Sequence, residues 1–265
     1  MTRLLALVML ALSLAAGLAG LAGCVSTTTG GTPRAEADPA DGEKRARVRL
    51  ELAGLYLGRG QAETALGEVE RAIAAKPDMP EAYNLRGLAY ATLGDLQRAE
   101  QSFLRALQLA PGNGDVMHNY GWFLCQQRRW PDAEAQFTAA LALPQYRDRM
   151  RTLLAQGVCQ ARAGRWAEAE RTLSRSYELD PSNPVTAYNL SEVLMRRGEL
   201  ERARFYIARI NSQPELSSAQ SLWLAVRIER RLGNLQGVQD FGRKLQERYP
   251  ESNEVLLYER GRFDD

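Results

Sequence analysis

A period of about 34 residues runs through most of this chain. When Pro77, Pro111 and Pro181 are aligned, small residues fall into register upstream, and alanines open the stretches that follow. The small residues are Ala53, Gly87, Gly121, Gly157 and Ser191, and the alanines are Ala65, Ala99, Ala133, Ala169 and Ala203. This period is typical of helix–turn–helix units, each of which leaves an apolar face that only a neighbouring unit can cover. The sequence therefore predicts a stack of helix pairs, which favours a protein-binding surface over a catalytic pocket.

The second unit shows the pattern most clearly. Its large and small positions are Tyr83, Leu85, Gly87, Tyr90, Gly94, Ala99, Phe103, Ala106 and Pro111. They resemble the tetratricopeptide repeat, in which small residues let two helices approach closely and large residues fill the opposite gaps. The resemblance implies an all-α fold: a right-handed superhelical solenoid of about six repeats with a C-terminal capping helix.

The repeat domain is expected to span residues 44–265. We place the repeats at about 46–79, 80–113, 114–147, 150–183, 184–217 and 219–252, and the cap at 253–265. In the sixth repeat, Val226, Val238 and Leu245 replace the small residues. Such divergence is expected of a terminal unit.

The N-terminal segment has the character of an export signal. Arg3 precedes the uncharged apolar run 4–21, which leads into Leu21-Ala22-Gly23-Cys24. This segment resembles a bacterial lipoprotein signal peptide, residues 1–23, which implies that Cys24 becomes the acylated first residue. Val25 stands where lipoproteins kept at the inner membrane often carry Asp, so the resemblance implies a lipid-anchored protein on the periplasmic side of the outer membrane. The alternative is an ordinary signal peptide or an anchoring helix with an incidental cysteine.

Residues 24–43 are expected to form a flexible, lipidated tether. This segment is rich in Ser, Thr, Gly, Pro, Asp and Ala and has no apolar period. It cannot bury enough apolar surface to offset the entropy cost of ordering it.

Composition and motifs argue against several functions. The chain has 34 Lys and Arg against 32 Asp and Glu, whereas nucleic-acid binding needs a clustered positive surplus. His118 is the one histidine, no Ser-His-Asp set can be assembled, and no Cys-x-x-Cys or His-rich tract offers a metal site. We therefore expect no enzymatic activity, no metal, no cofactor, no small-molecule substrate and no nucleic-acid partner.

Two further cysteines, Cys125 and Cys159, lie 34 residues apart near the ends of equivalent first helices. Stacking brings equivalent positions of adjacent repeats to within roughly 10 Å, and an exported protein meets oxidising conditions. We predict a disulfide between them; the alternative is two buried free thiols.

The stretch from His118 to Cys125 carries a second resemblance. With the lipoprotein start, six repeats and Cys159, it resembles the type IV pilus biogenesis lipoproteins, the secretin pilotins. This implies a scaffold that binds the pilus secretin and promotes its localisation and multimer assembly at the outer membrane, with acyl chains as its membrane contact. The alternative is a repeat lipoprotein that serves outer-membrane barrel assembly or recruits cell-wall enzymes.

First helices line the concave face of such solenoids, so their exposed positions are the candidate groove. These positions are Leu50, Gly54, Leu57, Asn84, Leu88, Ala91, His118 and Trp122. Apolar groups on a concave wall suit an amphipathic helix or apolar peptide; the alternative is that some of them complete the core. Arg227, Arg230 and Arg231 form a basic strip that could meet an acidic partner or could be a solvated face.

Overall fold

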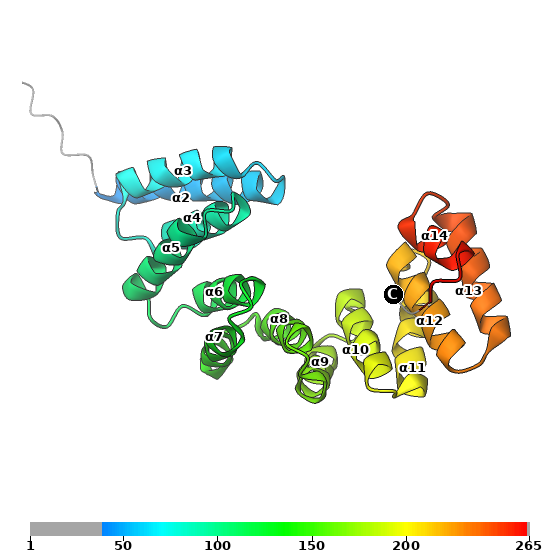
Figure 1. Cartoon of the computed structure of the whole chain (residues 1–265). Coiled ribbons are helices and arrows are strands. Elements are labelled where there is room, and N and C mark those ends of the chain that lie inside the picture. Colours follow the sequence, from blue (N-terminus) through cyan, green and yellow to red (C-terminus); the bar gives the residue numbers. More distant parts are fainter. Residues whose placement is uncertain (1–38, 264–265) are drawn as a thin grey trace, which may run out of the picture. The chain divides into compact units, whose positions relative to one another are not determined.

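The computed structural model describes residues 39–263, and this range folds into α-helices without a strand. Figure 1 shows their order along the chain. The helices are α2 (Pro39–Gly58), α3 (Ala62–Ala75), α4 (Pro80–Thr92), α5 (Leu96–Leu109), α6 (Gly114–Gln126), α7 (Trp130–Ala142), α8 (Arg149–Arg162), α9 (Trp166–Leu179), α10 (Pro184–Arg196), α11 (Leu200–Asn211), α12 (Ala219–Arg231), α13 (Leu235–Arg248) and α14 (Asn253–Glu259). The helices from α2 to α13 form six consecutive pairs, which confirms the predicted all-α fold of stacked repeats.

The turn inside each pair has a left-handed residue at the same place. It is glycine in five of the six pairs, with φ between 72° and 81° at Gly60, Gly94, Gly164, Gly198 and Gly233. The third pair has Arg128 instead, with φ 58°. Glycine adopts this conformation at little cost, whereas a side chain makes it unfavourable.

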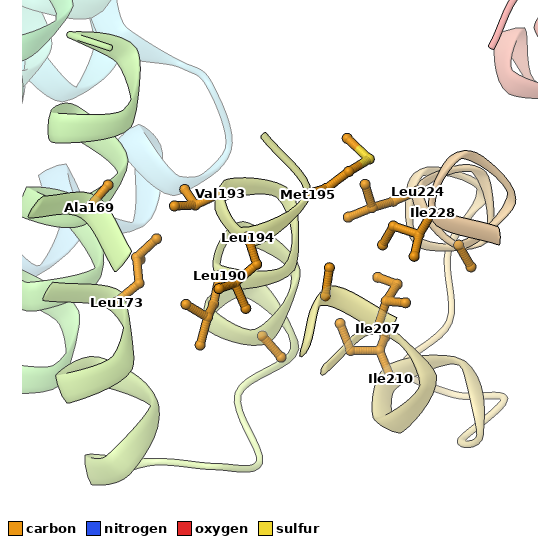
Figure 2. Close-up of a cluster of buried hydrophobic side chains, with 13 residues drawn as sticks. Ala169, Leu173, Leu190, Val193, Leu194, Met195, Ile207, Ile210, Leu224 and Ile228 are labelled. Atoms are coloured by element: carbon orange, nitrogen blue, oxygen red, sulfur yellow. The ribbon is translucent and has the colours of Figure 1, made fainter. Parts of the chain in front are cut away.

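Apolar side chains join successive repeats into a common core. Figure 2 shows this across the last three repeats, where side chains of α9, α10, α11 and α12 interlock in one buried cluster. The cluster includes Leu173, Leu190, Leu194, Ile207 and Ile228, none more than 1% exposed. Each apolar face is covered by the following repeat, as expected for a stack of this kind.

The sixth pair reverses the small and large positions. Val226 in α12 is fully buried where earlier repeats have a small residue, and Gly242 in α13 takes the ring of Tyr258 against its backbone. Tyr258 belongs to α14, the predicted capping helix. The divergence noted in the sequence therefore has a packing cause, because α14 needs a small residue on α13.

The first helix extends into the segment that we expected to be flexible. α2 begins at Pro39, so the last residues of the expected tether, 39–43, are helical, while the compact unit of the repeats begins at Glu43. Arg47 pairs with Glu43 one turn away (2.7 Å), and Ala46 is fully buried, so packing begins early in this helix. Residues 1–23, Cys24 and the remaining tether lie outside the described residues.

Candidate partner-binding surface

The first helices form the inner side of the stack. The backbones of α4 and α6, of α6 and α8, of α8 and α10, and of α10 and α12 approach each other. Second helices of adjacent repeats lie farther apart among the described helices and meet through long side chains, as in the ion pair of Arg202 in α11 with Glu170 in α9 (2.7 Å). Equivalent first-helix positions therefore follow one another in a row along this inner face. A partner bound along this inner face would therefore contact several successive repeats.

An apolar strip lies on the inner face of the first three repeats. We define it as Leu57 in α2, Leu88 and Ala91 in α4, and Trp122 in α6, all of which are half-buried. Gly54 is exposed one turn before Leu57, and a Cβ added there would meet no atom within 4 Å. These five of the eight expected groove residues are accessible to a partner.

Leu50 and His118 are core residues, so their expected place in an open groove is wrong. Leu50 is 7% exposed and belongs to the core cluster of the first repeat. His118 is 5% exposed, and its Nδ1 lies 2.9 Å from Oγ1 of Thr152 in the next repeat. Burial and the nearby charge of Arg151 lower the pKa of His118 to about 4. The imidazole is therefore a neutral link between repeats.

Asn84 takes part in a polar ladder along the inner face. The Asn119 side-chain amide donates to Asn84 Oδ1 (3.1 Å), and Arg151 donates to Asn119 Oδ1 (3.1 Å). The ladder joins α4, α6 and α8, and Asn84 remains half-buried. Its main part is structural, beside the apolar strip rather than within it.

Trp122 has a cationic neighbour from the next repeat. The guanidinium carbon of Arg162 in α8 lies 5.0 Å from the centre of the Trp122 ring. A cation over an indole face attracts the ring quadrupole and covers part of it. One face of this aromatic side chain is thus partly covered within the protein.

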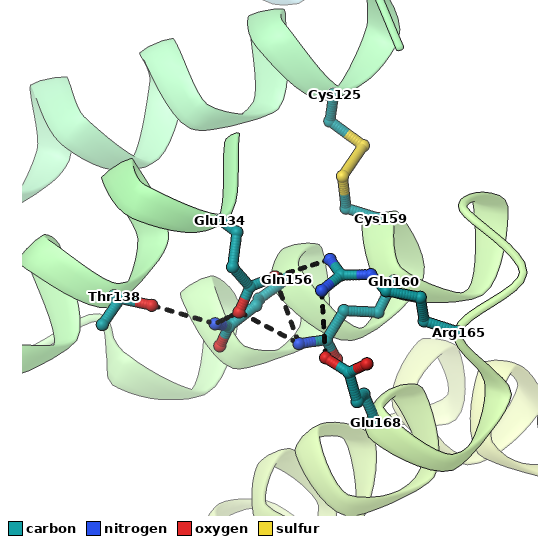
Figure 3. A network of polar contacts seen from close by, with 8 residues as sticks. All are labelled: Cys125, Glu134, Thr138, Gln156, Cys159, Gln160, Arg165 and Glu168. Carbon is teal, nitrogen blue, oxygen red and sulfur yellow. Dashed lines mark hydrogen bonds and ion pairs between the residues drawn. A yellow bond between two sulfur atoms is a disulfide. The ribbon is translucent and has the colours of Figure 1, made fainter. Parts of the chain in front are cut away.

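A disulfide joins the third and fourth repeats. Cys125 in α6 and Cys159 in α8 are bonded, each 1% exposed, with Cα atoms 5.8 Å apart (Figure 3). This separation is within the usual range for a disulfide. The bond covalently fixes the repeat that carries Trp122 to its neighbour.

Below the disulfide, Glu134 of α7 holds a polar network that sequence reasoning missed (Figure 3). Its carboxylate accepts hydrogen bonds from Gln156 (2.6 Å) and Gln160 (3.1 Å) of α8 and an ion pair from Arg165 (2.9 Å). Gln156 and Gln160 are both buried. The sequence feature that could have revealed this network is the pair of glutamines one helical turn apart, near the expected core face of α8.

The basic strip of the last repeat is only partly solvated. Arg230 and Arg231 are exposed, but Arg227 is 8% exposed, and its Nε donates to the Phe263 carbonyl (3.2 Å). Burial and the charge of Arg196 lower the pKa of Arg227. Arg227 is at the repeat position that is equivalent to Leu88 and Trp122, so the sequence already placed it on the inner face.

Within residues 39–263, no group of His, Cys, Asp and Glu side chains is placed to hold a metal ion. In the same range no helix is both long and apolar enough to cross a membrane.

Comparisons with known proteins agree with the repeat architecture. A tetratricopeptide-repeat family model matches residues 50–114 and 124–184, and a second tetratricopeptide-repeat model matches residues 160–222. Both matches lie within the helix pairs described above.

Two similar proteins act in type IV pilus biogenesis. The crystal structure of PilW, a widely conserved type IV pilus biogenesis factor, is 31% identical with a TM-score of 0.74, over 80% of this chain and 96% of PilW. The type IV pilus assembly protein PilF of Pseudomonas aeruginosa is 28% identical over 241 residues, 91% of this chain and 94% of PilF. A solved structure of Pseudomonas aeruginosa pilF has a TM-score of 0.70 at 23% identity, over 83% of this chain and 99% of that one.

Proposed function

Because the chain belongs to the tetratricopeptide-repeat proteins of type IV pilus biogenesis, we propose that it binds the pilus secretin and promotes its localisation and multimer assembly at the outer membrane. Tetratricopeptide scaffolds bind other proteins and are generally non-catalytic. The action we propose is capture and escort: the repeats hold a segment of the secretin while a lipid anchor directs the complex.

The observation that carries this proposal is the apolar strip. Leu57, Leu88, Ala91 and Trp122 come from three successive first helices and are all partly open to solvent. An amphipathic helix can bury its apolar face on such a strip by presenting residues at helical spacing. The ladder through Asn84 holds α4 and α6 together beside the strip and thereby preorganises it.

The proposed anchor is Cys24, with its lipoprotein-like sequence context. Each buried methylene of an acyl chain contributes about 0.8 kcal/mol, so several chains hold a protein firmly to a bilayer. The chain from Cys24 to the first helix would let the repeats reach away from the membrane surface.

The binding test replaces Leu88 with Glu and, separately, Trp122 with Glu. A charge on the strip opposes burial of an apolar partner face. We expect each variant to lower the fraction of secretin in heat-resistant multimers and to reduce twitching motility. Pull-down of the secretin by the purified variants measures binding directly.

Leu104→Glu is the matched control, because Leu104 is 44% exposed on α5, the second helix of the repeat that carries Leu88. This control should leave multimers unchanged. If wild-type multimers and motility persist after deletion of the whole gene, the secretin proposal is wrong. Capture of a barrel-assembly factor or a cell-wall hydrolase instead of the secretin would favour the alternative scaffold role.

The anchor is tested separately with Cys24→Ser. We expect this variant to lose its acyl chains, measured by palmitate labelling, and to leave the outer-membrane fraction while the purified repeats still bind the secretin. Retention in the outer membrane without acylation would contradict a lipid anchor at Cys24.

A further inference from the structure

The inner face of the fifth and sixth repeats carries a charged group of a different kind from the apolar strip. Arg196 is in the last turn of α10, and Arg227 and Arg231 are in α12. We call these three residues the arginine cluster. Arg162, Arg196 and Arg231 also occupy equivalent last-turn positions in three successive first helices, so the cluster continues a row of positive charge.

Arg227 is a buried cation without a matching carboxylate bond. Its side chain is 8% exposed, its Nε donates to the Phe263 carbonyl, and its Nη2 is buried without a hydrogen-bond partner. A buried guanidinium with an unused donor is costly, because donors taken out of water lose free energy unless they are paired. Because Nη2 is closed off from solvent, a ligand from outside would not bond this atom, but the uncompensated charge of Arg227 adds to the positive potential at the surface beside it.

Two positively charged neighbours add to the positive potential around Arg227. Arg196 and Arg231 both act to lower the pKa of Arg227, while Glu192 and Tyr188 act in the opposite direction. Arg231 donates to the Met195 carbonyl (3.2 Å), and in the described part of the chain neither Arg196 nor Arg231 forms an ion pair. The cluster therefore keeps a local positive surplus in a chain whose formal net charge is only +2.

The surface around the cluster already holds the turn that follows α14. Phe263, from the C-terminal end, stacks on Trp223 with ring centres 5.7 Å apart, and the Arg230 guanidinium lies 5.2 Å from the Phe263 ring centre. Arg227 receives the backbone carbonyl of the same residue. The chain's own C-terminal turn thus packs an aromatic ring and bonds a backbone carbonyl beside the arginine cluster.

We propose that the arginine cluster is a docking site for an acidic peptide segment of a partner protein, whose carboxylates bind the exposed Arg196 and Arg231 beside the buried charge of Arg227. Guanidinium groups bind carboxylates in charge-assisted and often bidentate pairs. A bilayer fits the site poorly, because Arg227 is buried on the inner side of the stack, where a flat surface does not reach. The site is on α10 and α12, away from the apolar strip on α2, α4 and α6, and it does not depend on the identity of the partner proposed above.

The test measures fluorescence anisotropy of a labelled peptide of alternating Glu and Gly, titrated with the chain from residue 24 carrying Cys24→Ser. The matched probe replaces every Glu with Gln. Arg196→Glu and Arg231→Glu are both at exposed residues, so they test the site without removing the buried Arg227. Arg171→Glu, at an exposed arginine of α9, makes the same charge change outside the cluster.

We expect Arg196→Glu and Arg231→Glu each to weaken binding of the Glu peptide by roughly tenfold, and Arg171→Glu to change it by less than about twofold. The Gln peptide should bind at least about tenfold more weakly than the Glu peptide. Equal binding of the two peptides, or equal loss in Arg171→Glu, would overturn the proposal. Arginine-dependent binding to phosphatidylglycerol vesicles without binding to the Glu peptide would also overturn it, in favour of a membrane surface.

Failure of this test and failure of the secretin proposal are distinguishable. Leu88→Glu changes the apolar strip and should not affect binding of the Glu peptide, whereas Arg196→Glu changes the cluster alone. Secretin multimers that persist in Arg196→Glu would leave the secretin proposal intact.

Discussion

Gly87 in α4 lies directly against the ring of Phe103 in α5, so that a Cβ added at Gly87 would be 2.8 Å from the ring. Phe103 is fully buried and packs against the rings of Tyr120 and Phe123. The same relation recurs between Gly121 and Phe137, and between Gly157 and Leu173. In each case the large residue follows the glycine by sixteen positions, so the same contact between first and second helix recurs in three successive repeats.

Gly87→Ala is therefore expected to destabilise the protein, although alanine is normally the better helix residue. Overpacking a buried contact costs about 1–3 kcal/mol, which outweighs the roughly 1 kcal/mol gained in helix propensity. The control is Gly67→Ala in the middle of α3, where an added Cβ meets no atom within 4 Å. We expect the thermal midpoint to fall for Gly87→Ala and to rise for Gly67→Ala. A rise in both would show that the close approach at Gly87 is not tight.

Arg128→Gly should stabilise the third repeat. Arg128 has φ 58°, where the equivalent turns of the other repeats have glycine. The left-handed conformation costs a side-chain-bearing residue about 1–2 kcal/mol, part of which is offset by the greater freedom of glycine in the unfolded chain. We expect a gain of up to about 1 kcal/mol in the free energy of unfolding, measured by urea denaturation. The reverse change, Gly94→Ala, should lower stability by a similar amount; a loss in Arg128→Gly would point to a favourable contact made by this arginine.

Reduction of the disulfide should destabilise the repeats. Cys125 and Cys159 close a loop with a sequence separation of 34 residues. Loss of a cross-link over a loop of this length costs about 3–4 kcal/mol in the chain-entropy account. We expect dithiothreitol to lower the urea midpoint of a Cys24→Ser chain. The same reductant should have no effect once both remaining cysteines are alanine. Detection of two free thiols in the denatured, unreduced Cys24→Ser chain would contradict the bond.

Mild acid should weaken the fold through His118. Burial and Arg151 lower its pKa from 6.5 to about 4 in the folded protein, so between these values the unfolded chain binds the additional proton. The contribution of His118 to the free energy of unfolding is therefore fully present above about pH 6.5, and it is lost as the pH falls towards 4. The loss between pH 7 and pH 5 is about 2 kcal/mol.

His118→Gln provides the control for this pH dependence, because the chain has a single histidine. Urea denaturation at pH 7 and pH 5 should show a smaller difference in the variant than in the wild type. Identical pH dependence in both proteins would mean that His118 takes up its proton in the folded state.

The helix pairs could be predicted because their determinants are local and periodic. Gly87, Gly121 and Gly157 face partners on the adjacent helix of the same repeat, so one repeat's sequence contains both halves of each contact. The comparison with PilW confirms the family resemblance seen in the sequence. The turn at Arg128 shows that the register holds even where the preferred residue is absent.

The surface was harder to predict because it depends on contacts between repeats. Asn84 and His118 occupy equivalent helix positions, yet Asn84 is half-buried and His118 is buried. His118 contacts Thr152 of α8, and the same Thr152 hydroxyl lies 2.7 Å from the Tyr146 hydroxyl in the segment before α8. That segment interrupts the regular spacing, so the repeat pattern could not reveal which residue it covers.

The disulfide also has a consequence for the chain after proteolysis. The loop between Ala142 and Arg149 lies inside the ring that Cys125 and Cys159 close, and exposed residues such as Gln145 and Arg147 make it accessible to a protease. A cut there would open the backbone but leave both fragments joined through sulfur. Such a nicked molecule would run as one band on a gel without reductant and as two bands with it, while its apolar strip and arginine cluster stayed on a single covalent unit.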